Sequence, residues 1–178
     1  MNATARLAEV PAQPISFTLD GQAVQAQQGD TIFQAAQRLG VDIPHLCYRE
    51  GHRADGNCRA CVVEIEGERT LAPSCCRQVS AGMQVQAGSE RARKSQKLVL
   101  EMLLSDMPDQ GYKWHEKDES LQHGELSDWA DCLDVTVRPA LKALRRVQPA
   151  ADVSHPAMAV NLDACIQCKR CVTACREE

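Results

Sequence analysis

The sequence predicts an α+β protein, in which a small mixed sheet packs on one helix and carries cysteines in its loops. Three observations support this fold class. Short runs of alternating apolar and polar residues recur up to residue 87, and one helical period interrupts them. Nine of the ten cysteines fall into two groups: Cys47, Cys58, Cys61, Cys75 and Cys76, then Cys165, Cys168, Cys171 and Cys175. The predicted organisation is a sheet domain over residues 15–88, a connector over 89–150 and a second cysteine-bearing module over 151–178.

Composition limits the classes of function. A chain of 178 residues holds one ordinary domain or two small ones, and 3% aromatic content leaves few large side chains for a core. The net charge of -4 argues against a nucleic-acid partner, because phosphate binding requires clustered Lys and Arg. No apolar run approaches the ~20 residues of a membrane span, and residues 1–14 lack the apolar region of a secretory signal. We therefore expect a cytoplasmic protein whose cysteines serve metal or redox chemistry, not disulfides.

The sheet domain is expected to follow a flexible tail of residues 1–14. Residues 15–20 alternate as a half-buried strand does, and 22–26 can return as the second arm of a hairpin. A helix over 31–39 comes next, because a Thr and a Gln at its start have the spacing of a capping box. Gly40 stands where a C-terminal cap belongs.

Three further strands complete the predicted sheet. They follow a loop rich in Gly, His and charged residues that carries the cysteines up to Cys61. Alternating residues predict strands over 62–65 and 83–87, and a returning strand over 70–72 lies between them. The result is a small mixed sheet with cysteines in its loops.

The connector is predicted to begin with a helix over 89–105, on which Leu98 stacks on Met102 and Val99 on Leu103 at i, i+4. Residues 106–130 are expected to form a loop with one short helix, and 137–147 contain a second, basic one. A linker then leads to a short strand before the last cysteine group.

The first cysteine group has the spacing Cys47-x10-Cys58-x2-Cys61-x13-Cys75. Four thiolates are the usual complement of a [2Fe-2S] cluster, and small residues at 51, 56 and 60 let backbone N–H groups approach its sulfides. A structural zinc site is the main alternative, although such sites usually contain two Cys-x2-Cys pairs. A disulfide framework would need an oxidising compartment, and a thioredoxin-like pair would follow a strand and open a helix.

Three segments around these cysteines resemble a known electron-transfer family. They are Ile43-Pro44-His45-Leu46-Cys47, Asp55-Gly56-Asn57-Cys58-Arg59-Ala60-Cys61 and Ser74-Cys75. The family includes the large iron–sulfur subunit of respiratory complex I, the small diaphorase subunit of NAD-linked hydrogenases and the alpha subunit of NAD-dependent molybdenum formate dehydrogenases. The resemblance covers residues 15–105 and implies a β-grasp, plant-ferredoxin-like [2Fe-2S] domain. It also implies that Cys75 is the fourth ligand, which leaves Cys76 as a buried free thiol.

The middle of the chain departs from that family's pattern. In the complex I and hydrogenase subunits, a His-Pro and three cysteines after this helix hold a [4Fe-4S] cluster. Here Met107 stands at the histidine position and Gly111 at the first cysteine position, and no cysteine follows until Cys132. We expect no cluster in this segment and assign no metal role to Cys132, His115 or His123.

The last cysteine group, Cys165-x2-Cys168-x2-Cys171-x3-Cys175, has the spacing of one half of a bacterial-type ferredoxin. In two-cluster ferredoxins the fourth cysteine of each run binds the other cluster, so Cys175 is expected to serve a second [4Fe-4S] cluster. Zinc is a poor alternative, because four cysteines so close in sequence crowd one tetrahedral ion. No second run follows and Arg176 replaces the usual proline, which predicts that the chain is the first part of a longer protein.

The segment from Ser154 to Asp163, with the cysteine run after it, most resembles the formate dehydrogenase alpha subunit. This implies electron transfer from a molybdopterin site elsewhere in the protein, through the clusters, to a flavin- and NAD-binding subunit, with a small iron–sulfur subunit as a further partner. We expect no catalytic residue in this chain, because the cofactors carry the redox chemistry. The alternatives are a subunit of an NAD-reducing hydrogenase or of a complex I-type NADH dehydrogenase and, from another class, a zinc-bound structural or interaction module.

Overall fold

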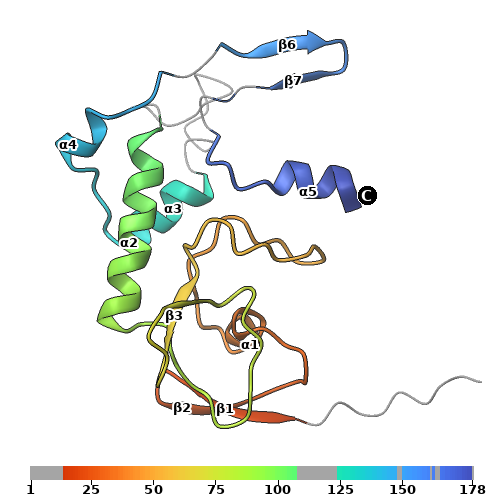
Figure 1. The fold of residues 1–178 in the computed structure, drawn as a ribbon, viewed down its shortest axis with the longest axis vertical. Coiled ribbons are helices and arrows are strands. Elements are labelled where there is room, and N and C mark those ends of the chain that lie inside the picture. Colours follow the sequence, from red (N-terminus) through yellow and green to blue (C-terminus); the bar gives the residue numbers. More distant parts are fainter. Residues whose placement is uncertain (1–13, 108–123, 148–149, 161, 163–164, 178) are drawn as a thin grey trace, which may run out of the picture.

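The computed structural model describes residues 14–107, 124–147, 150–160, 162 and 165–177, so nearly all of the predicted tail lies outside the described residues. Its N-terminal part is a five-stranded sheet in the order β2-β1-β5-β3-β4 (Figure 1). The strands are β1 Ile15–Leu19, β2 Gln22–Ala26, β3 Val62–Ile65, β4 Ala72–Pro73 and β5 Gln84–Gln86. Since β1 pairs antiparallel with β2 and parallel with β5, the sheet is mixed, as predicted for a ferredoxin-like domain.

The helix α1, Ile32–Arg38, begins and ends where the sequence predicts. The Thr31 hydroxyl accepts the backbone N–H of Gln34 at 3.2 Å, and the Gln34 side chain accepts that of Thr31 at 3.0 Å. This reciprocal pair is the predicted capping box. Beyond the helix Gly40 has φ 71°, a conformation that glycine adopts without strain at a helix end.

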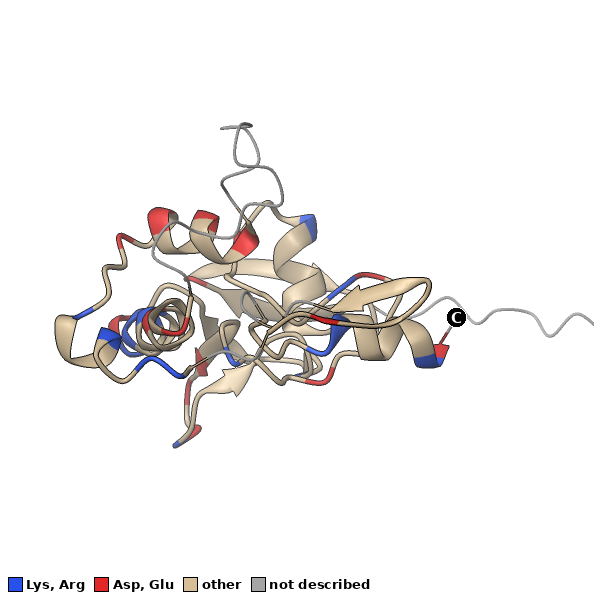
Figure 2. Ribbon diagram, turned by 90° about the horizontal axis from the view of Figure 1, so that it is seen from above, with Lys and Arg blue, Asp and Glu red and all other residues tan. Residues whose placement is uncertain are grey.

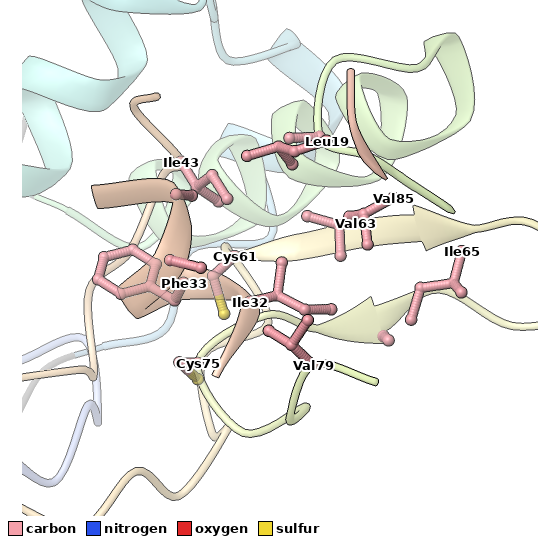
Figure 3. Close-up of a cluster of buried hydrophobic side chains, with 14 of the residues drawn as sticks. Leu19, Ile32, Phe33, Ile43, Cys61, Val63, Ile65, Cys75, Val79 and Val85 are labelled. Carbon is pink, nitrogen blue, oxygen red and sulfur yellow. The ribbon is translucent and has the colours of Figure 1, made fainter. Parts of the chain in front are cut away.

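One hydrophobic core lies between α1 and the sheet (Figure 3). Its members come from both elements and from the loops that join them: Phe17, Leu19, Ile32, Phe33, Ile43, Val63, Ile65, Val79 and Val85. Cys61 and Cys75, 1% and 0% exposed, belong to the same core. Their sulfurs therefore lie in apolar surroundings that exclude water.

The predicted strands agree with the structure except at one edge. Along β5, Val85 is buried while Gln84 and Gln86 are exposed, which is the predicted alternation. The strand expected at 70–72 is displaced and forms β4, Ala72–Pro73, at the edge of the sheet. A proline is tolerated there because an edge strand needs no N–H on its open side.

The long helix α2, Glu90–Ser105, has the predicted length and packs one of its two predicted stacks against a core. Val99 and Leu103 contact this core, whereas Leu98 and Met102 are 41% and 62% exposed. The buried face also includes Gln96, which is only 1% exposed. Its amide donates to the backbone carbonyl of Val62 at 2.9 Å, and this polar contact sets the orientation of the helix.

Two shorter helices follow, α3 Glu125–Cys132 and α4 Pro139–Lys142. The short basic helix expected within 137–147 is α4, and Cys132 is exposed. An ion pair between Arg138 and Glu101, at 2.7 Å, ties the start of α4 to α2. Residues 108–123 lie outside the described residues, so the prediction that Gly111 replaces a ligand and that His115 and His123 bind no metal is not addressed.

The C-terminal part contains a hairpin, β6 Asp152–His155 and β7 Met158–Val160, and the helix α5 Arg170–Glu177. The sequence analysis expected a linker where β6 lies, and β6 forms a strand because β7 pairs with it. Figure 2 shows acidic and basic residues on helices and loops alike. Among the described residues no helix is long and apolar enough to cross a membrane.

Candidate metal centre

The structure brings the four cysteines of the first group together from three segments. Cys47 and Cys58 lie on the loop after α1, Cys61 directly precedes β3, and Cys75 lies in the turn after β4. Ser74 anchors this turn, because its N–H donates to Cys61 O and its carbonyl accepts Phe33 N–H, both at 3.1 Å. The sheet and α1 thus fix the fourth cysteine relative to the third.

The four thiols lie close enough to influence one another. The pKa of Cys47 is shifted by Cys58 and Cys75, and that of Cys61 is shifted by Cys75. Burial divides the four into two pairs, because Cys61 and Cys75 are buried whereas Cys47 and Cys58 are half-buried.

These contacts favour negative charge on two of the sulfurs. Hydrogen bonds from Cys58, and then from Cys75, lower the pKa of Cys47 to about 2. A hydrogen bond from Cys75 is the largest cause that lowers the pKa of Cys61 to about 7. The pKa values of Cys58 and Cys75 rise, chiefly because each thiol donates its proton to Cys47. These contacts therefore favour the thiolate, the form that binds metal, at Cys47 and Cys61, and the protonated thiol at Cys58 and Cys75.

Backbone N–H groups add to this stabilisation. The N–H of Cys58 donates to the Cys47 sulfur at 3.4 Å, and the N–H of Asn57 also lowers the pKa of Cys47. In the same loop Gly56 and Arg59 have positive φ, of 58° and 60°. Left-handed residues placed in this way turn successive N–H groups to one side, an arrangement common at iron–sulfur sites.

Four thiolates, two for each of two irons, are the ligand set of a [2Fe-2S] cluster. Within the described ranges, no group of three or more His, Cys, Asp or Glu side chains, these four cysteines included, is placed to hold a single metal ion. The donor set therefore fits a two-iron centre by its chemistry, not by the placement of its side chains.

Cys76 does not lie where the sequence analysis expected it. It is exposed, not buried, and its sulfur lies 3.6 Å from that of Cys75. The expectation assumed an extended backbone, on which adjacent side chains face opposite ways. The backbone instead turns here, because Cys76 N–H donates to the carbonyl of Pro73 at 3.0 Å. Both sulfurs therefore lie on the same side of the chain.

The last cysteine group packs against the loop of the first. Cys165, Cys171 and Cys175 are exposed, whereas Cys168 is half-buried and lines a small cavity together with Cys47. The Asn57 side chain donates to the carbonyl of Gln167 at 2.7 Å. Figure 1 shows α5 beside the loop that precedes β3. Two cysteine groups far apart in sequence thus face one cavity.

Arg170 makes the most extensive contacts between the two groups. One terminal nitrogen donates to the carbonyl of Tyr48 at 2.8 Å, and the other pairs with Glu125 of α3. Its Nε is buried and has no hydrogen-bond partner within the described parts of the chain. The sequence analysis gave this residue no role, and only its place between Cys168 and Cys171 could have suggested one.

An aromatic cluster supports the loop from the other side. His45 packs edge-on against Phe33 and Trp129, with ring centroids 4.7 and 5.7 Å apart, and Phe33 also contacts Tyr48 at 4.6 Å. These contacts join α1, the loop around Cys47 and α3. They hold the loop in place although aromatic residues are only 3% of the chain.

Comparison with known proteins agrees with this site. Residues 12–90 match the family described as 2Fe-2S iron-sulfur cluster binding domain. The chain is 34% identical, over 90% of its length, to the NADP-reducing hydrogenase subunit HndD of Solidesulfovibrio fructosivorans. It is 35% identical, over 94% of its length, to the mitochondrial NADH-ubiquinone oxidoreductase 78 kDa subunit of Candida albicans. It spans only 27% and 22% of these two relatives.

A solved structure gives the same result. The chain is similar to a chain of NAD+-reducing [NiFe]-hydrogenase in the H2-reduced state, with a TM-score of 0.75 and 30% identity. The similarity covers 92% of this chain and 66% of that one. The chain thus contains a 2Fe-2S iron-sulfur cluster binding domain over residues 12–90 and is homologous to iron–sulfur subunits of NADH-quinone oxidoreductases and of NAD-reducing hydrogenase.

Proposed function

We propose that this chain transfers electrons through a [2Fe-2S] cluster held by Cys47, Cys58, Cys61 and Cys75, as part of an NAD-linked oxidoreductase complex. The match of residues 12–90, which contain these four cysteines, to a 2Fe-2S iron-sulfur cluster binding domain carries the proposal. The cluster supplies one-electron redox chemistry. The chain provides the ligands, an apolar core that keeps water from two of them, and backbone N–H groups that stabilise negative charge.

The two pairs of thiols have different surroundings. Cys61 and Cys75 lie in the core, whereas Cys47 and Cys58 are half-buried, and Cys47 borders the cavity shared with Cys168. We assign one iron to each pair. The Cys47 side is then the side toward the last cysteine group.

We assign the last group to [4Fe-4S] chemistry, with Cys165, Cys168 and Cys171 as ligands of one cluster and Cys175 as a ligand of a second. The spacing supports this assignment. The position of Cys168 across a small cavity from Cys47 supports it as well, since short distances between redox centres favour electron transfer. On this proposal, electrons pass between the two groups directly.

Two assignments of the whole complex remain in competition. The names of the relatives support a hydrogenase or an NADH dehydrogenase, with other subunits of the same complex as partners. The substitution of Met107 and Gly111 for cluster ligands favours a formate dehydrogenase alpha subunit, with a molybdopterin site elsewhere in the protein and a flavin- and NAD-binding subunit as partner. The complex purified from its source decides between them. Formate should reduce the cluster only in a formate dehydrogenase and hydrogen only in a hydrogenase, whereas in an NADH dehydrogenase neither should and NADH alone should.

Electron paramagnetic resonance of the reduced protein tests the cluster itself. Cys58→Ala should abolish the reduced-cluster signal, because one iron loses a thiolate. Cys76→Ala is the matched control and should retain the signal. A zinc module would instead be colourless and would show no dithionite-dependent bleaching. Persistence of the signal in Cys58→Ala would refute the ligand assignment.

A further inference from the structure

A hydroxyl group lies buried beside the candidate cluster without a hydrogen-bond partner. Ser74 is 0% exposed, and within the described part of the chain its Oγ makes no hydrogen bond. Buried polar groups in native proteins are nearly always paired, because burial without a partner costs free energy. An exception next to a candidate redox centre requires an explanation.

The backbone of Ser74 holds this hydroxyl in place. Its N–H donates to the carbonyl of Cys61, and its own carbonyl accepts the N–H of Phe33, both at 3.1 Å. These bonds tie the residue to the start of β3 and to the first turn of α1. Ser74 cannot move toward solvent unless these two contacts break.

The side chain of Ser74 lies on the same face of the strand pair as that of Cys61. Val62 pairs with Pro73 in antiparallel register, and the Ser74 N–H donates to Cys61 O at 3.1 Å, so Cys61 and Ser74 stand opposite each other, both buried. Sulfur is a weak acceptor as a thiol and a much stronger one as a thiolate. A cluster ligand is a thiolate, so a cluster on Cys61 would give this hydroxyl its acceptor.

We propose that Ser74 is a positioning residue that donates a hydrogen bond to the Cys61 sulfur of the [2Fe-2S] cluster and so stabilises its reduced form. The inference rests on the proposed cluster. Reduction adds one electron to the cluster, and Ser74 keeps its proton throughout. Because the added charge strengthens the hydrogen bond more in the reduced than in the oxidised state, the bond raises the reduction potential.

A redox titration of the reconstituted protein, followed by electron paramagnetic resonance, tests the inference. Ser74→Ala should lower the equilibrium constant for reduction about tenfold, which for one electron is a potential about 59 mV more negative. The conservative variant Ser74→Thr keeps the hydroxyl and should shift the potential less. Ser80→Ala removes an exposed hydroxyl from the same loop region and should leave the potential unchanged.

The outcomes separate this inference from the proposed function. A wild-type protein without iron or signal overturns both. A Ser74→Ala protein with a full cluster and the wild-type potential overturns only the role of Ser74, as does an equal shift in Ser80→Ala. If Ser74→Ala takes up no cluster, Ser74→Gly also removes the hydroxyl and leaves no side chain. Its equilibrium constant for reduction should likewise be about tenfold lower than that of the wild type.

Discussion

At Gly56 the loop of the first cysteine group packs directly on Cys76. A Cβ atom at this position would lie 2.9 Å from the Cys76 sulfur and 3.6 Å from Pro73. The residue also has φ 58°, which non-glycine residues adopt only with strain. Position 56 therefore requires glycine for two reasons: its backbone is left-handed, and a Cβ atom there would lie too close to the Cys76 sulfur.

Gly56→Ala should consequently lower the free energy of unfolding of the cluster-loaded protein by about 1–3 kcal/mol. Gly51→Ala is the control, because Gly51 also has a positive φ, of 83°, but no atom lies within 4 Å of a Cβ placed there. This variant should therefore lose only the free energy that the strained backbone costs. Urea titration under anaerobic conditions measures both. Adding Cys76→Ala to Gly56→Ala should recover part of the loss. Equal losses in the two glycine variants would show that packing on Cys76 is unimportant.

At the scale of single elements, local signals in the sequence predicted most of the structure. The capping box at Thr31 and the alternation around Val85 depend on spacing alone, and the structure reproduces both. The buried face of α2 was predicted only in part, through Val99 and Leu103, because the hydrogen bonds of Gln96 depend on backbone groups that the sequence pattern does not reveal. The strand β6 was missed because it exists only through pairing with β7.

At the candidate site, too, local signals could be predicted from the sequence, whereas contacts between distant segments could not. Spacing identified Cys47, Cys58 and Cys61, the family resemblance added Cys75 as the fourth ligand, and whether these cysteines bind a cluster stays a prediction. The positions of Cys76 and Ser74 could not be predicted, since both depend on the turn at Pro73 and on its contacts with α1 and β3. The contacts of Arg170 were missed because its partners are distant in sequence. Tyr48 lies more than a hundred residues away and Glu125 lies forty-five residues away.

Gln96 is the element-scale test of how α2 docks on the sheet. Its amide donates to Val62 O at 2.9 Å and to Ala87 O at 3.4 Å, and replacement by Met keeps the volume but removes both donors. Gln96→Met should cost about 1–3 kcal/mol of unfolding free energy, because buried carbonyls lose their partner. Lys97→Met, exposed on the same helix, should stay within about 0.5 kcal/mol of wild type. Similar values for the two would contradict the docking role.

At the scale of the whole molecule, two apolar cores hold the chain together. The second core contains Leu46 from the cysteine loop, Leu100 from α2 and Leu126 from α3, and Ile166 of the last cysteine group packs against it. The contacts of Arg170 lie beside this core. The last group is thus held to the rest of the chain by one apolar and one polar contact region.

Arg170→Gln should therefore loosen the last group without unfolding the sheet domain. Hydrogen exchange should become faster in residues 165–177 and stay unchanged in α1 and β3. Lys169→Gln makes the same change of charge one residue earlier, at an exposed position, and should have little effect. Unchanged exchange in the Arg170 variant would mean that the other contacts, those of Ile166, of Asn57 with Gln167 and of Glu177 with His52, hold the segment without it.

The central claim is that the thiols of Cys47, Cys58, Cys61 and Cys75 hold a [2Fe-2S] cluster, and iron and acid-labile sulfide per chain test it most directly. After anaerobic reconstitution of residues 1–178 we predict about two irons and two sulfides, because the last group's thiols are mostly exposed. About six irons would show that the last group also fills in this chain. Zinc without sulfide, or iron that persists in Cys58→Ala, would contradict the central claim.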